Sequence, residues 1–171
     1  MPRAGTHALG GDTIVGMNAR AALLSLLAAC ALPRVADAQG PVVPYGGVAL
    51  EQWLAAGHYR QWRSEGAPHP SEGPHFGRVR AYLNPVLYAS LEAGAKRHPA
   101  GAVAVKELYG DGDAVKGWAV YIKIDSADVA ESWYWYEKFE SRVVADARGV
   151  LLCRSCHFTG RDYVLTPWPL K

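Results

Sequence analysis

Residues 102–139 have the sequence AVAVKELYGDGDAVKGWAVYIKIDSADVAESWYWYEKF, and this stretch decides the fold. Its segments 102–109, 117–124 and 131–139 are rich in Val, Ile, Trp and Tyr, residue types that favour β-strands. Turn residues such as Gly110-Asp-Gly-Asp113 separate them. Because short strands joined by short turns pair with their neighbours, we expect an antiparallel meander.

The sequence before this stretch predicts one more strand and two helices. Residues 78–83 alternate in polarity, as a half-buried strand does, and Asn84-Pro85 then opens a helix that runs to about Arg97. Helical spacing over 48–63 predicts the other helix, interrupted near Gly57. Residues 66–77 are dense in Gly and Pro and are expected to form a surface loop that holds His69 and His75.

These elements predict an α+β fold, mostly an antiparallel β-sheet meander with a few helices, in a single domain over 39–171. The chain has 171 residues, half of them hydrophobic, and a formal net charge of +2, which suits one globular domain. It has no stripe of Lys and Arg that would neutralise a phosphate backbone, so we expect no nucleic-acid partner.

The N-terminal region has the pattern of a secretory signal peptide over residues 17–38. An arginine precedes the apolar run Ala21–Leu32, and the small-residue triplet Ala36-Asp-Ala38 follows it. The run is far shorter than the roughly 20 residues of a membrane span. We therefore expect export to the periplasm after cleavage behind Ala38, with residues 1–16 an over-called translation start. Leu27-Ala-Ala-Cys30 resembles a lipobox, so a lipoprotein acylated on Cys30 is the alternative.

Near the C-terminus, Cys153-Arg-Ser-Cys156-His157 has the C-x-x-C-H spacing of c-type haem attachment. On a helical turn, residues three apart share a face, so both thiols reach one edge of a porphyrin and the following imidazole lies beneath the iron. The sequence thus predicts one haem c, bound covalently through Cys153 and Cys156, with His157 as the axial iron ligand.

Two cysteines at this spacing also occur in zinc sites, redox pairs and disulfides, but each of these fits the sequence less well. A structural zinc site usually needs four ligands, and Cys30 is the only further cysteine, upstream of the predicted cleavage. A thioredoxin-like redox pair belongs at the start of a helix in a βαβ unit, which the strand pattern does not provide. A disulfide is compatible with export but does not require His157.

The sequence offers no methionine as a sixth iron ligand. Met1 and Met17 both precede the predicted cleavage site. The remaining histidines of the predicted mature chain are His58, His69, His75 and His98. A histidine, a lysine or an open position is left for the sixth ligand. No histidine has a motif that places it opposite His157, so we expect a five-coordinate iron whose open face binds a small molecule.

The order of segments resembles the cytochrome P-460 family, whose relatives include the β-sheet type of cytochrome c prime. The resemblance covers most of the predicted mature chain and rests on Tyr59–Trp62, Tyr82–Pro85, Gly101–Tyr109, Ser132–Tyr136, and the haem motif with Asp162–Leu165 after it.

The resemblance implies a mostly antiparallel β fold, commonly a homodimer, with a five-coordinate haem c. It implies oxidation of hydroxylamine to nitric oxide or nitrous oxide, with electrons passed to a periplasmic acceptor. By position, Lys106 is the candidate for a covalent cross-link to the porphyrin. Strand periodicity puts Lys106 on one face with Ala102, Ala104 and Leu108, where small side chains leave room for a flat ring.

One feature departs from the hydroxylamine-oxidising members, which use a distal carboxylate for proton transfer. Phe158–Arg161 follow His157 without an acidic residue, so Asp162 or a chain of water molecules is left to take protons. Phe158 instead favours an apolar pocket, as in a protein that binds nitric oxide or carbon monoxide without turnover. A plain electron carrier is the third alternative, disfavoured by the lack of a Met ligand.

Overall fold

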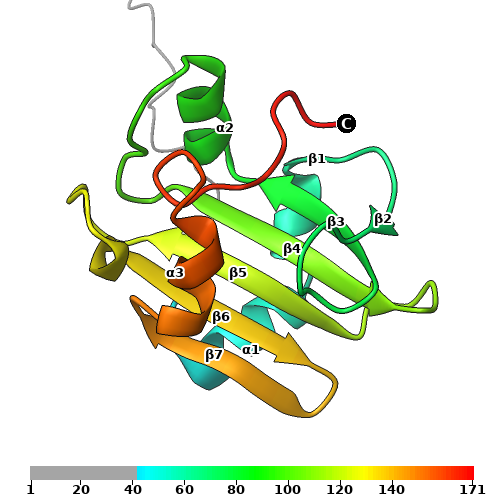
Figure 1. Ribbon diagram of the computed structural model, residues 1–171. Helices are drawn as coiled ribbons and strands as arrows, with labels where there is room; N and C mark the ends of the chain where they lie inside the picture. The colour runs from blue at the N-terminus through cyan, green and yellow to red at the C-terminus, as the bar shows by residue number, and fades with distance from the viewer. Residues whose placement is uncertain (1–41) are drawn as a thin grey trace, which may run out of the picture. The chain divides into compact units, whose positions relative to one another are not determined.

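The fold centres on one antiparallel seven-stranded sheet, with strand order β1-β3-β4-β5-β6-β7 and with β2 beside β3 (Figure 1). The strands are β1 (Arg63–Ser64), β2 (His69–Pro70), β3 (Arg78–Leu83), β4 (Val103–Gly110), β5 (Gly117–Lys123), β6 (Trp133–Phe139) and β7 (Arg142–Arg148). Each of the strands β3 to β7 pairs with the next strand in the chain. A helix lies between β3 and β4 in the sequence. The predicted α+β class and antiparallel meander are confirmed.

The protein is described by a computed structural model over residues 42–171, which belong to one compact unit. The predicted signal peptide (17–38), the region 1–16 and Cys30 lie outside the described residues. Within 42–171, no helix is both long and apolar enough to span a membrane.

The predicted strands agree with the structure to within two residues, but β1, β2 and β7 were not predicted, and Arg63, predicted as the end of a helix, belongs to β1. Residues Glu131 and Ser132, predicted as strand, belong to the short 3-10 helix η3 (Ala130–Ser132). Strand β7 gave no clear signal because it lies at the sheet edge and is mostly exposed. Of its residues only Ala145 is buried, so it lacks the regular apolar alternation that marks a half-buried strand.

The two predicted helices begin where expected and end early. Helix α1 (Gly47–Ala55) stops before Gly57, whose φ of 71° is left-handed, and the 3-10 helix η2 (His58–Gln61) continues the segment. Helix α2 (Pro85–Glu92) is capped by the Asn84 side chain, which accepts a hydrogen bond from the Leu87 N–H at 2.9 Å. It ends five residues before Arg97 because Gly94 turns left-handed, with φ of 65°.

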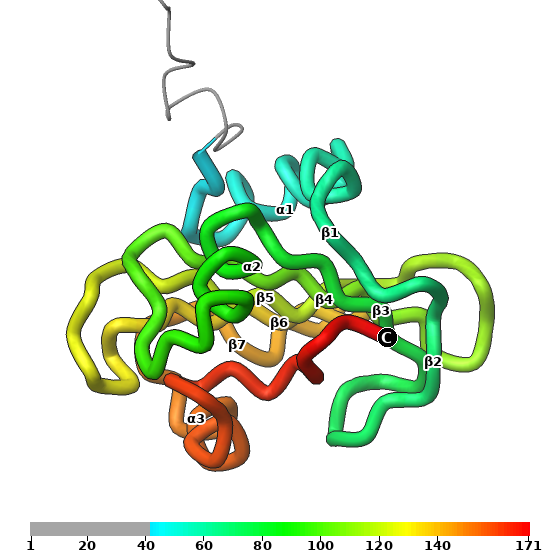
Figure 2. Tube along the Cα trace, turned by 90° about the horizontal axis from the view of Figure 1, so that it is seen from above, coloured from blue at the N-terminus to red at the C-terminus, as the bar shows by residue number. Residues whose placement is uncertain are grey.

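The two faces of the sheet pack against different elements (Figure 2). One face packs on α1 through an aromatic-rich core that includes Trp53, Tyr59 and Tyr136. The opposite face carries α2, α3 (Leu151–His157) and the C-terminal segment. The C-x-x-C-H motif therefore lies on a helix against the second face, and the chain beyond it runs back over the same face.

Residues 66–77 form a loop, as predicted, with one exception. His69 and Pro70 form the two-residue strand β2, paired with Val79 and Arg78 of β3. The prediction that the whole segment is irregular was wrong at these two residues. Pro70 is tolerated because β2 lies at the sheet edge, where a strand can lack one N–H donor.

Candidate functional site

A cavity of about 760 Å³ opens on the second face of the sheet. Its walls come from the sheet, from α3, from the loop of residues 65–76 and from residues 165–167. Cys153, Cys156, His157 and Lys106 all line it. The cavity is within the size range of small-molecule and cofactor sites. The two predicted attachment cysteines, the predicted axial histidine and the candidate cross-linking lysine therefore border one space.

The register of four neighbouring strands builds the floor of the cavity. Lys106 on β4 is paired with Ala81 on β3 and with Ala119 on β5, and Ala119 is paired with Glu137 on β6. Because paired residues point to the same face, the row alternates small and ionisable side chains. The predicted face is confirmed in this respect: Ala104 and Leu108 lie in the apolar clusters of the same sheet face.

Helix α3 presents both cysteines to the cavity. The three-residue spacing places them one helical turn apart on one side of the helix. Both thiols are free; Cys153 is half-buried and Cys156 is exposed. Burial raises the pKa of the Cys153 thiol to about 12, so this group is protonated at neutral pH.

His157, the last residue of α3, is oriented by a single hydrogen bond. Its Nδ1 lies 2.8 Å from the backbone carbonyl oxygen of Tyr163. A carbonyl oxygen only accepts, so Nδ1 carries the proton and Nε2 carries the lone pair. No residue among 42–171 forms a hydrogen bond to Nε2. This is the arrangement in which a histidine ligates a metal through one nitrogen while the other is fixed by the protein.

The surroundings of the imidazole keep it neutral. The ring centroids of Trp135 and Tyr121 lie 4.8 and 5.6 Å from that of His157, both edge-on. Burial lowers the pKa of His157 to about 4, so it is unprotonated at neutral pH. The lone pair is available without any prior loss of a proton.

Lys106 is a half-buried, charged residue in the cavity wall. Burial lowers the pKa of its ammonium group, and the carboxylates of Glu65, Glu137 and Glu72 oppose that shift. Within the described chain no hydrogen bond or ion pair holds its Nζ. Ionisable side chains in protein interiors are ordinarily paired. An unpaired lysine in a cavity wall therefore suggests a site that receives a ligand.

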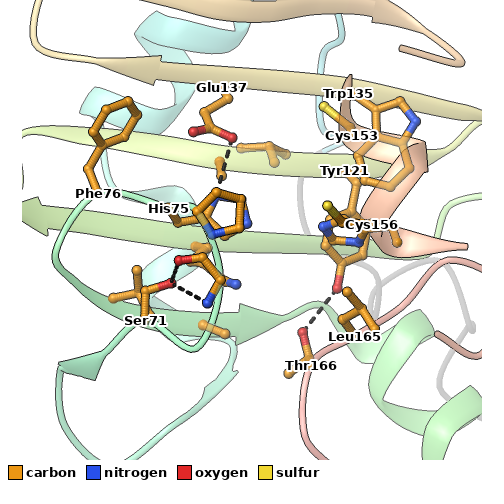
Figure 3. Close-up of a pocket in the computed structure, with 18 of the residues that line it drawn as sticks. Ser71, His75, Phe76, Tyr121, Trp135, Glu137, Cys153, Cys156, Leu165 and Thr166 are labelled. Atoms are coloured by element: carbon orange, nitrogen blue, oxygen red, sulfur yellow. Dashed lines mark hydrogen bonds and ion pairs between the residues drawn. The ribbon is translucent and has the colours of Figure 1, made fainter. Parts of the chain in front are cut away.

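Glu137 and His75 form a second ionisable group in the cavity. Their Oε2 and Nδ1 atoms are 3.2 Å apart, although their orientation does not satisfy the criteria of a hydrogen bond. Figure 3 shows the two side chains pointing toward each other, with both cysteines on the side of Trp135 and Tyr121. The His75 ring centroid lies 6.3 Å from that of His157.

These contacts correct the prediction for the loop histidines. His75 was expected at the surface, but only 16% of its side chain is exposed and it faces the cavity. His69 is more exposed and lies 3.0 Å from the buried carboxylate of Glu65. His98 is buried and contacts Ser90 Oγ and the Arg161 carbonyl oxygen, away from the cavity lining.

Two expectations for residues after the haem motif are wrong. Asp162 does not line the cavity; its carboxylate is buried and paired with Lys123 Nζ at 2.9 Å. Phe158 forms no apolar wall, since it is 67% exposed and does not belong to the lining. The acidic residues that border the cavity are Glu65, Glu72 and Glu137, none of which was predicted, and Glu137 is the one that lies on the sheet in the same row as Lys106. The signal for Glu137 was present in the alternation of β6, where it shares a face with Trp135.

The comparisons with known proteins assign no family, because no protein-family model and no curated protein matches the chain. Among residues 42–171, no group of three or more His, Cys, Asp and Glu side chains is arranged to hold a metal ion. Covalent attachment of haem c uses a different set of groups, namely two thiols for the ring and one axial nitrogen for the iron beside a cavity. Cys153, Cys156 and His157 fit that set, since all three line one cavity and the His157 Nε2 is unpartnered within the described chain.

Proposed function

We propose that the protein is an exported, mono-haem c-type cytochrome that oxidises hydroxylamine. In this proposal Cys153 and Cys156 bind haem through thioether bonds and His157 is the axial ligand. The observation that carries the proposal is the orientation of His157. Its lone-pair nitrogen has no partner among the described residues and lies on the same helix as two free thiols, beside one cavity.

The haem, when bound, supplies an iron that accepts electrons from a small nitrogen compound. The first contribution of the protein is to exclude water from the imidazole of His157. Trp135 and Tyr121 are buried and pack edge-on to the imidazole, so the ligand lies in an environment of low dielectric constant. The Tyr121 hydroxyl is held by Thr166 Oγ1 at 3.0 Å, which fixes this ring in place.

Lys106 is the residue we propose to bond to the porphyrin: its nitrogen would replace a hydrogen of a ring carbon, with loss of two protons and two electrons to an external oxidant such as hydrogen peroxide. A neutral amine is the nucleophilic form of lysine, and burial shifts the pKa of Lys106 toward that form. Its neighbours across the sheet are Ala81 and Ala119, whose small side chains leave room for a flat ring over the amine. The lack of a partner for Nζ in the described chain supports the same role.

Glu137 and His75 are the groups that we propose take protons. Oxidation of hydroxylamine releases protons along with electrons, so a base must stand within reach of the substrate. Glu137 shares a face and a register row with Lys106, and its carboxylate touches the imidazole of His75. A proton accepted by Glu137 can pass to His75, whose loop borders the solvent side of the site.

Binding of nitric oxide or carbon monoxide without turnover is the competing function. The aromatic wall of Trp135 and Tyr121 favours it, because a gas ligand needs no base and is retained by apolar surroundings. The ionisable groups of the same cavity favour the enzyme. A gas pocket gains nothing from a lysine, a carboxylate and a histidine whose burial costs free energy.

The test begins with protein isolated from the periplasm of its native host. Mass spectrometry should find one haem on a chain that starts near Gln39, and acidic butanone should extract none of it. Peptide mapping should find Lys106 modified, and hydroxylamine should reduce an added one-electron acceptor. Covalent haem with Lys106 unmodified, no turnover and tight nitric oxide binding would establish the competing function instead.

A further inference from the structure

The turn Asp162–Tyr163 holds the carbonyl group that orients His157. Both residues have left-handed backbone conformations, with φ of 46° and 67°, and neither is glycine. Such conformations are sparsely populated and persist only where the surroundings impose them. Here they aim the Tyr163 carbonyl at the His157 Nδ1–H, which donates to it at 2.8 Å.

A buried ion pair imposes this turn. The side chains of Asp162 and Lys123 are both fully buried, and Asp162 Oδ1 accepts a hydrogen bond from Lys123 Nζ at 2.9 Å. Asp162 Oδ2 accepts from the backbone N–H of His98 at 2.8 Å. The carboxylate thus ties the turn to β5 and to the segment after α2 at the same time.

Lys123 is itself held rigidly. Its ammonium group also donates to Ser132 Oγ at 2.7 Å and to the Ala127 carbonyl at 2.9 Å, and it lies 4.9 Å from the centroid of the Trp133 ring. All three donor positions of the ammonium are therefore occupied. Buried, fully hydrogen-bonded ion pairs contribute less to net stability than to a unique geometry.

We propose that the Lys123–Asp162 pair positions the axial ligand, by fixing the Tyr163 carbonyl against His157 Nδ1. Asp162 is thus a positioning residue, neither a proton acceptor nor a ligand. A carbonyl oxygen that accepts a hydrogen bond from Nδ1–H raises the basicity of Nε2, so a metal bound to Nε2 is held more strongly. This inference rests on the proposed haem ligation and adds to it the device that sets the ligand's strength.

The test compares Asp162→Asn with Glu107→Gln in the haem-loaded protein. Asparagine tolerates a left-handed backbone but carries no charge for Lys123 and presents an amide N–H₂ where an acceptor is needed. Glu107→Gln neutralises an equally buried carboxylate on the opposite face of the sheet, so it controls for loss of a buried charge. The readouts are the iron–histidine stretching frequency of the ferrous protein and the reduction potential.

The expected result is a lower and broader iron–histidine frequency, with a higher reduction potential, in Asp162→Asn and no change of either in Glu107→Gln. Ser132→Ala, which removes one bond to Lys123, should shift both in the same direction by less and keeps the test usable if Asp162→Asn fails to fold. Unchanged frequency and potential in whichever of these variants folds would overturn the inference. Wild-type protein without covalent haem would instead overturn the proposed function.

Discussion

Two adjacent residues of β4 are ionisable, and the structure treats them in opposite ways: Glu107 is buried, whereas Lys106 is half-buried in the wall of the cavity. Glu107 points toward α1 and is 2% exposed. Its carboxylate accepts hydrogen bonds from the hydroxyls of Tyr59, Tyr82 and Tyr109, and from Arg60 Nε. Lys106 points to the other face and, among the described residues, has no hydrogen-bond or ion-pair partner.

The contrast separates a charge that maintains the fold from one that is available for chemistry. Four donors around Glu107 offset the cost of burying it, so this carboxylate belongs to the core of the α1 face. Lys106 is half-buried, and within the described chain only the more distant carboxylates of Glu65, Glu137 and Glu72 favour its charge, without a hydrogen bond or ion pair. The same face holds His157 with its Nε2 unpartnered. Uncompensated polar groups are rare in native proteins and often mark a place where a ligand or ion binds.

The largest effect should come from removing the two thiols on the cavity face. We expect the Cys153→Ala/Cys156→Ala variant to carry no covalent haem, because no thioether bond can form. Haem staining of denaturing gels and intact-protein mass spectrometry of periplasmic extracts measure this. Ser155→Ala, a change between the two cysteines at an exposed residue, is the control and should keep its haem. Full covalent haem in the double variant would refute the proposed attachment.

The contrast between Lys106 and Glu107 is tested by substituting each residue separately. Lys106→Ala should abolish hydroxylamine oxidation and give an ordinary c-type spectrum, with the free energy of unfolding changed little, because the half-buried ammonium group has no hydrogen-bond or ion-pair partner in the described chain. Glu107→Ala should leave the spectrum unchanged and lower the free energy of unfolding by about 3 kcal/mol, because four donors lose their acceptor. Urea titrations and activity assays of both variants check this. If Glu107→Ala alters the spectrum as strongly as Lys106→Ala, the two faces are not functionally distinct.

A smaller, more specific effect is expected from the carboxylate beside Lys106. Glu137→Gln should lower the turnover of hydroxylamine by about 10² or more, the usual contribution of a positioned base. The binding of nitric oxide should change little, since a gas ligand gives up no proton. Stopped-flow kinetics and gas titrations separate the two properties. Equal loss of both would mean that Glu137 shapes the cavity and does not act as a base.

The neutral imidazole of His157 should make the haem-free chain sensitive to acid. Its folded-state pKa of about 4 lies below the ordinary value of 6.5. Since the unfolded state binds the proton more readily, stability is full above about pH 6.5 and falls by about 3 kcal/mol as pH drops toward 4. Urea midpoints across this range measure it. His157→Asn, which cannot take up that proton, should show a weaker decline, and an identical decline would contradict the assignment.

The sequence predicted most of the sheet because alternation is a local property. Strands β4 and β5 carry continuous Val, Ile and aromatic signals, and the three-residue spacing of Cys153 and Cys156 was enough to place both on one side of a helical turn. The face that Lys106 occupies also followed from period two alone. Each of these inferences needed only residues close together in the chain.

The rest of the site depends on long-range register, which no local pattern specifies. Glu137 reaches Lys106 only because β6 pairs with β5 in one register, and His75 reaches Glu137 only through the fold of a Gly- and Pro-rich loop. Asp162 was expected to serve the cavity since it follows His157 closely in the chain. It is instead bound by Lys123, a partner 39 residues away.

The smallest effect should come from Phe158, which follows His157 directly in sequence. Proximity in the chain suggested an apolar wall for a gas ligand, but α3 ends at His157 and leaves the Phe158 ring 67% exposed. Phe158→Ser should therefore change the free energy of unfolding by no more than about 0.5 kcal/mol, as exposed substitutions do. Affinity for nitric oxide and turnover of hydroxylamine should both be unchanged.

The matched control is Trp135→Leu, which removes a buried ring 4.8 Å from the imidazole and should destabilise the protein by at least about 2 kcal/mol. Gas titrations and urea melts of the two variants give the comparison. A large loss of gas affinity in Phe158→Ser would mean that the residue after His157 does wall the site, and the gas-binding function would then gain over the enzyme.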